Sequence, residues 1–427
     1  MNTKKKLFLF LIFIIVSPAM YGAESCSKYY LSIERDFIRD WGVQLLKSND
    51  KTFNDLDYKR RLLEMRPGSV PYAGWIPGIN FEFMKIFREF QKYIANTDFA
   101  YMPSVLRFTN TGTDANNAIY ELAEYAFFKR TGKQAKRPNL MYFGDPYGGT
   151  YGRVAEIGVR YETNLKIKKQ FQVPTPYTDS LENHSKDETK RLEKIENKAL
   201  EFIRKQSAKT SLEIGGIFLE PITTTKGLRF FRKEFLIKLR ELADELNLPI
   251  IADEIFTGGG RTGTFWGFQN YGDFRPDLVT FGKGIGVSGI IEYTRSVVIN
   301  DRIVSRWNWP SFENTTGESK KYPEAVFDNT SRVNPLQLLQ SLQILKRIVN
   351  DDLPLNAKEV GAYALERMKY KLKSLGINDQ IKGVGLLFDV GDKTDALVGK
   401  NGVSHYNGRW SPPLTMTKEE FNVLLDK

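Results

Sequence analysis

The sequence predicts an α/β fold built on a mainly parallel β-sheet with helices on both faces. The first observation is a series of short apolar runs bounded by turn residues, as in buried strands: NLMYFG, IGGIFLE, LPIIADEI, DLVTFG and TRSVVIN. The second is that helical patterns lie between several of these runs. The third is that the runs are apolar throughout instead of alternating, which is typical of strands covered on both faces.

The helical segments are recognised by apolar residues that recur every three or four positions. Residues 115–129 and residues 235–246 each place such residues on one face. Residues 180–205 are a charge run whose apolar residues keep the same spacing, so we expect a solvated amphipathic helix there. A fourth helix begins at Pro335, and the C-terminal runs GVGLLFDV and WSPPLTMTKEE follow it.

The N-terminus has the pattern of a secretory signal peptide. Three lysines precede an apolar run from Leu7 to Val16, and small residues follow. The run is too short for a membrane span, which needs roughly 20 residues. We expect cleavage after Ala19 or Ala23, export to the periplasm or the medium, and no stable membrane span afterwards. An uncleaved anchor is the alternative.

The chain of 427 residues therefore divides into four expected parts. Residues 1–23 are the signal peptide, and residues 24–104 are an N-terminal segment that contributes to a small domain and to the pocket. Residues 105–334 form a large domain that carries the site. Residues 335–427 complete a small α+β domain at the C-terminus.

Composition excludes several classes of site. The chain has a single cysteine, Cys26, and two histidines, His184 and His405, so we expect no metal centre built from these residue types. The net charge is +11, and loss of the three signal-peptide lysines lowers it to +8. Because no dense cluster of basic and aromatic residues accompanies this charge, we expect no nucleic-acid partner.

Two stretches combine turns with residues that bind anions or flat rings. In FTNTGTDANNAIYELA, Gly112 and Thr113 stand at the start of a helix, where free backbone N–H groups and the positive helix end attract an anion. In MYFGDPYGGTYG, a strand runs into a loop that carries Tyr147, which could stack on a flat ring. Either feature alone also occurs in ordinary helix caps and loops.

Two further stretches bring a carboxylate and a lysine to the ends of strands. Asp253 ends the apolar run of PIIADEIFTGGGRTG, where a buried carboxylate requires a partner such as a protonated ring nitrogen. Lys283 follows the next strand, in DLVTFGKGIGVSG. A phosphate-binding P-loop does not fit the second stretch, because Asp277 and Gly284 occupy positions that need a glycine and a Ser or Thr. Both side chains should lie where open α/β sheets bind ligands.

An anion site, an aromatic ring, a carboxylate and a lysine are together the parts that hold pyridoxal phosphate. The lysine forms a Schiff base, and the carboxylate keeps the pyridine nitrogen protonated. From about Val105 to Thr417 the chain resembles the class III pyridoxal-phosphate aminotransferases of fold type I. The similar segments are FTNTGTDAN, FLEPITTTKGLRFF, DNTSRVNP, GRWSPPLTMT and, most specifically, ADEIFTGGGRTGTFWGFQNYGDFRPDLVTFGKGIG.

The resemblance implies roles for individual residues. Lys283 would be the Schiff-base lysine and proton carrier, and Asp253 would pair with the pyridine nitrogen. Gly112 and Thr113 would hold the phosphate, and Tyr147 would stack on the ring. Three further assignments come from the family pattern alone: Glu220 as the active-site glutamate, Thr330 as a phosphate ligand from the second subunit of a homodimer, and Arg409 as the partner of the substrate carboxylate. Phe256 stands where the family frequently has glutamine.

The resemblance implies an aminotransferase that moves an amino group from an amino acid, ω-amino acid or diamine to a keto acid by a ping-pong mechanism. Another pyridoxal-phosphate enzyme of the same fold, such as an aminomutase, racemase or decarboxylase, is the first alternative, because fold does not decide reaction type. An exported binding protein without catalysis is the second. The presence of both Lys283 and Asp253 argues against it, since a scaffold needs neither.

Overall fold

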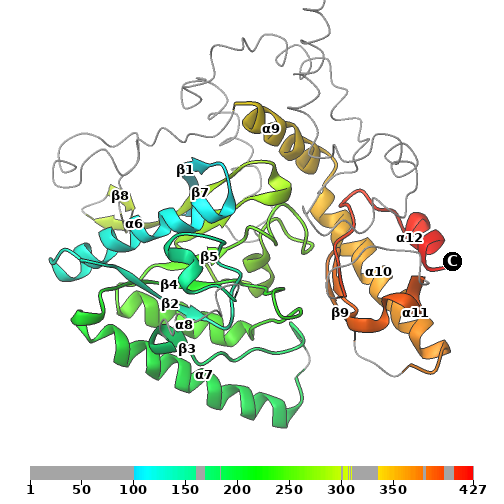
Figure 1. The fold of residues 1–427 in the computed structure, drawn as a ribbon, viewed down its shortest axis with the longest axis horizontal. Coiled ribbons are helices and arrows are strands. Elements are labelled where there is room, and N and C mark those ends of the chain that lie inside the picture. The colour runs from blue at the N-terminus through cyan, green and yellow to red at the C-terminus, as the bar shows by residue number, and fades with distance from the viewer. Residues whose placement is uncertain are drawn as a thin grey trace, which may run out of the picture.

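The computed structural model describes residues 101–159, 169–182, 184–299, 302–305, 307, 309, 335–377, 381–398 and 408–426. The expected signal peptide, residues 24–100 of the expected N-terminal segment and Thr330 lie outside these ranges, whereas residues 101–104 of that segment belong to a strand of the large sheet. Within them, the chain forms a large sheet with flanking helices and, beside it, a smaller sheet with C-terminal helices (Figure 1).

The large sheet has eight strands in the order β1-β7-β6-β5-β4-β2-β3, with β8 paired to β7. The pairs among β2, β3, β4, β5 and β6 are parallel, as the apolar runs predict, whereas β1, β7 and β8 pair antiparallel at the other edge. The strands are β1 (Tyr101–Thr109), β2 (Asn139–Phe143), β3 (Gln172–Val173), β4 (Ile214–Leu219), β5 (Ile250–Asp253), β6 (Leu278–Phe281), β7 (Ser288–Ile299) and β8 (Arg302–Ser305).

Helices cover both faces of this sheet, as expected for buried parallel strands. Helix α6 (Gly112–Thr131) lies on one side, and helices α7 (Lys186–Ser207) and α8 (Lys233–Glu245) lie on the other (Figure 1). Gly215 of β4 shows how closely α6 approaches, since a Cβ there would lie 2.1 Å from the carbonyl oxygen of Ala123. On the opposite side, the rings of Phe143 in β2 and Phe235 in α8 meet edge to face with centroids 5.7 Å apart.

Helix α6 begins and ends on local signals that the sequence carries. Thr111 is the N-cap, and its hydroxyl accepts from the Asp114 N–H while the Asp114 carboxylate accepts from the Thr111 N–H. The helix ends at Gly132, whose φ of 69° is the left-handed conformation that glycine adopts readily. This cap determines where the first turn of α6, and therefore its free N–H groups, is placed.

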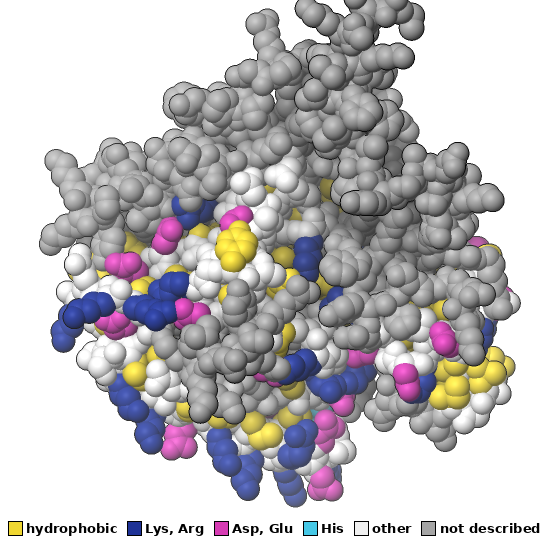
Figure 2. Space-filling view, viewed as in Figure 1, with side chains coloured by type: hydrophobic (Ala, Val, Ile, Leu, Met, Phe, Trp, Pro, Cys, Tyr) yellow, Lys and Arg dark blue, Asp and Glu magenta, His cyan; other side chains and the backbone are white. Residues whose placement is uncertain are grey.

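The charge run forms the amphipathic helix α7. Leu192, Ala199 and Ile203 are buried, and Figure 2 shows lysine, arginine and acidic side chains along the edge of the molecule where α7 lies. Cations and anions are interspersed there, which is typical of a solvated helix face.

Beside the large sheet, the C-terminal residues form a three-stranded antiparallel sheet in the order β11-β10-β9. Its strands are β9 (Lys382–Val384), β10 (Leu387–Asp389) and β11 (Arg409–Trp410), and the accompanying helices are α9 (Pro335–Asn350), α10 (Leu353–Ser374), α11 (Thr394–Val398) and α12 (Lys418–Leu425). This α+β arrangement agrees with the fold expected for the C-terminal segment.

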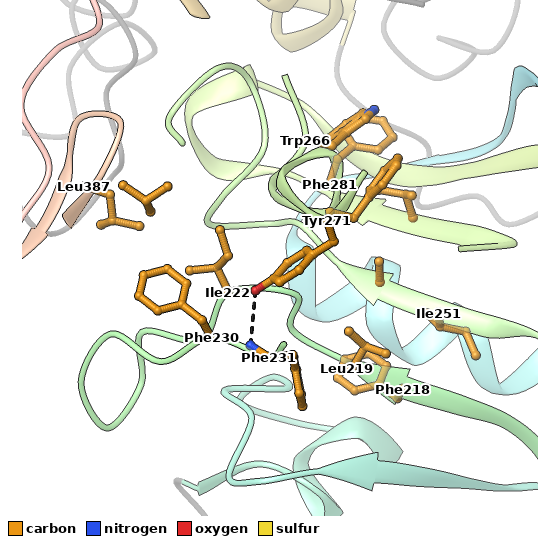
Figure 3. Close-up of a cluster of buried hydrophobic side chains, with 14 of the residues drawn as sticks. Phe218, Leu219, Ile222, Phe230, Phe231, Ile251, Trp266, Tyr271, Phe281 and Leu387 are labelled. Atoms are coloured by element: carbon orange, nitrogen blue, oxygen red, sulfur yellow. Dashed lines mark hydrogen bonds between the residues drawn. The ribbon is translucent and has the colours of Figure 1, made fainter. Parts of the chain in front are cut away.

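An apolar core fills the space between the end of β4, the loop that follows it and the segment after β5. Figure 3 shows Phe218 and Leu219 of β4, Ile222, Phe230 and Phe231 of the following loop, and Tyr271 and Trp266 from beyond β5. The Tyr271 hydroxyl donates to the Pro221 carbonyl at 2.7 Å and accepts from the Phe231 N–H at 3.3 Å. The loop after β4 is thus held against the segment that follows β5.

Arg261 connects the large sheet to the small one. Its side chain is fully buried, and its Nη1 donates to the Leu386 carbonyl at 3.0 Å and also to the Pro412 carbonyl. The Arg261 carbonyl in turn accepts from the Leu386 N–H at 3.0 Å. Burial lowers the pKa of this guanidinium to about 9. The loop after β5 therefore both donates hydrogen bonds to the C-terminal segments and accepts one from them.

Asp277 fastens the beginnings of β5 and β6 to α8. Its buried carboxylate accepts from Arg240 Nη1 at 2.5 Å, from the Ile250 N–H at 2.8 Å and from the Trp307 indole N–H at 3.0 Å. Arg240 is itself buried in α8. This ion pair holds two of the parallel strands whose opposite ends carry the residues described below.

Replacing Asp277 by Ala should lower the free energy of unfolding by about 3–5 kcal/mol, because it leaves the Arg240 charge buried without this carboxylate. Urea denaturation of Asp277→Ala checks this, with the exposed Asp273→Ala as the matched control that should change stability by less than about 0.5 kcal/mol. Equal stabilities of the two variants would contradict the role given to Asp277.

Candidate active site

Four residues singled out from the sequence meet at one edge of the large sheet. Asp253 is the last residue of β5, Glu220 follows β4 directly, Lys283 follows β6 by two positions, and Tyr147 lies in the loop after β2. These four strands are parallel neighbours, so their carboxyl ends lie side by side. The position agrees with the edge at which open α/β sheets bind ligands.

Asp253 is a buried carboxylate held by two N–H donors. Asn116 Nδ2 donates to Oδ2 at 2.8 Å, and the Ile255 N–H donates to Oδ1 at 3.0 Å. Burial raises the pKa of Asp253, while these two hydrogen bonds and the Lys283 charge oppose the rise. The carboxylate is thus suited to pair with a cationic N–H group placed against it.

Glu220 lies close enough to Asp253 for the two charges to interact. Burial and then the Asp253 charge raise the pKa of Glu220 to about 7, although the Thr223 hydroxyl, the Tyr147 N–H and Lys283 work in the other direction. The Tyr147 N–H donates to Glu220 Oε1 at 2.8 Å, which ties the loop after β2 to the end of β4. Glu220 therefore positions the backbone of Tyr147.

Lys283 projects from a tight turn, and its side chain is exposed. Its φ of 48° is in the left-handed region that non-glycine residues rarely adopt, and such strain is concentrated at functional sites. The flanking Gly282 packs closely on β7, because a Cβ there would lie 2.6 Å from Ser288 Oγ and this side chain would have to move. The Lys283 ammonium lies 5.5 Å from the Tyr147 ring centroid and 4.5 Å from that of Phe256.

The first turn of α6 faces this group of residues. Gly112 and Thr113 are its first two residues, where backbone N–H groups have no partner within the helix. Gly112 packs tightly on the segment after β5, since a Cβ there would lie 2.7 Å from Ile255 Cδ1. The Thr150 N–H donates to Thr113 Oγ1 at 3.4 Å, so the loop that carries Tyr147 folds over the start of the helix.

Asn116 is a site residue that the sequence reasoning missed. Besides its bond to Asp253, its Nδ2 donates to the Gly148 carbonyl at 2.7 Å, and Asn116 is buried. Among the residues that the structure describes, its Oδ1 has no hydrogen-bond partner. The available signal was an asparagine one turn after Gly112, since asparagine is unfavourable inside helices unless its side chain is used elsewhere.

Arg409 reaches the same region from the small sheet. Its Nη1 donates to Thr224 Oγ1 at 3.1 Å and to the Thr224 carbonyl at 3.3 Å, and its guanidinium carbon lies 4.4 Å from the Phe256 centroid. A cavity of about 200 Å³ adjoins it, lined by Thr224–Leu228, Asp389 and Arg409. The arginine expected to bind a carboxylate thus borders an open space.

The residues present fit pyridoxal phosphate. The start of α6 offers N–H groups to a phosphate, Asp253 offers a buried acceptor to a protonated ring nitrogen, and Lys283 offers an exposed amine to an aldehyde. Within the described ranges, no group of three or more His, Cys, Asp or Glu residues could hold a metal ion. The site therefore recognises the cofactor through its charged groups, the phosphate and the ring nitrogen, and through its aldehyde.

Comparison with known proteins shows the family to which the chain belongs. A family model described as aminotransferase class-III matches residues 79–427. An uncharacterized aminotransferase of Bacillus subtilis, YhxA, is 24% identical over 75% of this chain and 73% of its own length. Ornithine aminotransferase 2 of Staphylococcus aureus is 30% identical, over 49% of this chain and 51% of its own length.

Among solved structures, a lysine aminotransferase from M. tuberculosis is similar with a TM-score of 0.68. It is 21% identical in sequence, and the match covers 90% of this chain and 86% of that one. At this identity the likeness concerns the fold, and it places the large sheet and the C-terminal sheet in a known arrangement.

Replacing Asn116 by Ala should lower the free energy of unfolding by about 1–3 kcal/mol at pH 8, because the Asp253 carboxylate and the Gly148 carbonyl each lose a donor. The loss should shrink as the pH falls from 8 through the pKa of Asp253, because the bond from Asn116 stabilises the ionised form of Asp253, whose pKa is raised in the folded chain. Urea denaturation of the cofactor-free protein across this pH range measures both effects.

The matched control is Asn117→Ala. Asn117 holds the same loop, through the Tyr151 carbonyl at 2.9 Å and the Val154 N–H at 3.1 Å, but bonds to no carboxylate. Its loss of stability should be independent of pH. If the two variants show the same pH dependence, Asn116 does not act through the charge of Asp253.

Proposed function

The chain belongs to the class III aminotransferases, which use pyridoxal phosphate, and from this premise we propose which of its residues carry out amino transfer and on which substrates. The observation that carries the proposal is the convergence of Lys283, Asp253 and the start of α6 at one edge of the sheet. The amine, the buried carboxylate and the anion site in this arrangement match the aldehyde, the ring nitrogen and the phosphate of the cofactor.

We assign the cofactor's phosphate to the backbone N–H groups of Gly112 and Thr113, and its ring nitrogen to Asp253. The bound cofactor supplies an electron sink that weakens the bonds at the substrate's α-carbon. Burial alone would favour a neutral Asp253, so the two N–H donors and the cationic partner are needed to keep it ionised. Tyr147 stacks on the ring face, and Glu220 holds the Tyr147 backbone in place.

Lys283 has two tasks in this proposal. Its Nζ would hold the cofactor through the cofactor's aldehyde group, and once a substrate amine takes that place, the free Nζ would accept the proton that leaves the substrate's α-carbon. The exposed side chain and the glycines on both sides of Lys283 leave room for this movement. A water-accessible amine beside two carboxylates is suited to both steps.

The amino donor is an amino acid, an ω-amino acid or a diamine, and the acceptor is a keto acid. The guanidinium of Arg409 supports a carboxylate on at least one of the two, because its planar group can bind a carboxylate through two parallel hydrogen bonds. The cavity beside Arg409 offers the polar side chains of threonine, lysine and aspartate together with the apolar Leu228, so it can contact both the polar groups and the carbon chain of a substrate.

Replacing Lys283 by Ala should abolish amino transfer, by about a thousandfold or more, because the variant loses both the amine that captures the cofactor and the proton carrier. Borohydride reduction followed by peptide mass analysis should find pyridoxal phosphate attached at position 283 in the wild type and at no site in the variant. Lys233→Ala, at an exposed position on α8, is the control and should behave as the wild type. Residual transfer above about a percent in Lys283→Ala would exclude this lysine as the catalytic amine.

We also propose that the active unit is an exported homodimer. The dimer rests on Thr330 as a phosphate ligand of the neighbouring subunit, and export rests on residues 1–23, both outside the described residues. None of the helices described between residues 112 and 425 has the length and apolar character needed to cross a bilayer. Sedimentation with and without pyridoxal phosphate should give a dimer that the cofactor stabilises, and cell fractionation should find the chain outside the cytoplasm. A fully active monomer, or an uncleaved cytoplasmic chain, would refute the corresponding part.

A further inference from the structure

Phe256 lies against both cations of the site. The Lys283 ammonium is 4.5 Å from the Phe256 ring centroid, and the guanidinium carbon of Arg409 is 4.4 Å from the same centroid. The two cations are therefore separated by no more than the sum of these distances. The two cations belong to different sheets, since Lys283 follows β6 of the large sheet and Arg409 begins β11 of the small one.

We propose that Phe256 is a positioning residue whose ring holds the Lys283 ammonium and the Arg409 guanidinium by cation–π contact, and thereby couples the carboxylate site to the reactive amine. This inference rests on the function proposed above for those two residues. A cation within about 6 Å of an aromatic centroid is attracted to the ring, by ~0.5–2 kcal/mol depending on its exposure. Both distances meet this condition.

The backbone around Phe256 is held in place, so the ring is a fixed support. The neighbouring Glu254 is fully buried, and its carboxylate accepts from the Gly267 N–H at 2.8 Å and from the Phe268 N–H at 2.7 Å. Its carbonyl accepts from the Gly258 N–H at 2.8 Å. Directly before Phe256, the Ile255 N–H donates to Asp253 Oδ1 at 3.0 Å. Phe256 thus stands in a segment anchored immediately before and after it.

Several charged groups act on Lys283 together with the ring. The Asp253 and Glu220 carboxylates attract its ammonium, the Tyr147 ring lies 5.5 Å away, and the Arg409 charge repels it across Phe256. The carboxylates and the two rings favour the charged amine, whereas Arg409 favours the neutral one. A substrate carboxylate that binds Arg409 offsets its charge. The repulsion between Arg409 and the Lys283 ammonium, which face each other across Phe256, is then weaker.

The test measures the reactivity of Lys283 in the cofactor-free protein, so it does not depend on catalysis. Acetic anhydride acetylates the neutral amine, releasing acetate and a proton, and peptide mass analysis quantifies the product at Lys283 as a function of pH. In Phe256→Leu the ammonium loses the ring, so the midpoint of the profile should fall by roughly 0.4–1.5 pH units. At a pH below both midpoints, acetylation should be roughly threefold to thirtyfold faster than in the wild type. Lys233, measured in the same samples, is the internal control and should not change.

Aromatic replacement separates a cation–π effect from a change of packing. Phe256→Tyr and Phe256→Trp should keep the midpoint at or above the wild-type value, because both side chains retain a ring face. These two variants also test the proposal if Phe256→Leu does not fold. A midpoint that moves equally in the leucine and the aromatic variants would show a steric effect and would overturn the proposal.

A double-mutant cycle tests the coupling to Arg409. Arg409→Ala should raise the Lys283 midpoint in the wild type, because it removes a repelling charge, and should raise it by less than half as much in Phe256→Leu. Additive shifts would overturn the coupling, since the effects of two independent sites add. If acetylation behaves as expected while the wild type fails to capture pyridoxal phosphate at Lys283, the proposed function fails and the electrostatic role of Phe256 stands.

Discussion

The structure depends on one requirement, which is to keep a negative charge buried at the end of β5. Removing a carboxylate from water is unfavourable unless hydrogen-bond donors or a cation replace the water. Asn116 and the Ile255 N–H meet part of that requirement. Since Asn116 belongs to the first turns of α6 and also bonds to Gly148, it fixes three segments relative to one another. One side chain therefore connects the anion-binding start of the helix, the loop that carries Tyr147 and the strand that carries Asp253.

The parallel order of the strands supplies the rest of the geometry. Strands β2, β4, β5 and β6 are neighbours that end at the same edge, so residues far apart in the chain meet there without long loops. At the opposite end, Asp277 fastens β5 and β6 to α8. The large sheet is therefore held by an ion pair at one edge and carries the candidate site at the opposite edge. Arg409 reaches that site from the smaller sheet.

Much of this arrangement was predictable from the sequence, and the failures have physical causes. Strands β4, β5 and β6 were recognisable because their runs are apolar throughout, and α6 because its cap and apolar face agree. The segment Tyr101–Thr109 was not predicted as β1, since its polar and apolar residues follow no clear pattern, and nothing local shows that β7 runs antiparallel to β6.

Within the site, the strand ends that carry Asp253 and Lys283 follow from the sequence, whereas the contacts between distant side chains do not. Asn116 bonds to a residue 137 positions away, and Arg409 bonds to a residue 185 positions away. Such pairings depend on how whole elements pack, and no periodicity or motif encodes them. The sequence showed Phe256 only as a departure from a family pattern. Its contacts with Lys283 and Arg409 could be recognised only in the structure.

The bonds of Arg261 have a consequence for the order in which the protein matures. Its guanidinium lies in the loop after β5, but its acceptors belong to residues 125 and 151 positions later in the chain. During synthesis on a ribosome, the loop that carries Phe256 is made long before those carbonyl groups exist. The strands of the large sheet all precede residue 306, so they are synthesised before the acceptors of Arg261. The Arg261 guanidinium cannot make its buried hydrogen bonds until the C-terminal segments have been synthesised. The site is thus completed last, after nearly the whole chain has emerged, and a nascent chain stalled before Pro412 would expose an unfinished site to the cell's quality-control machinery.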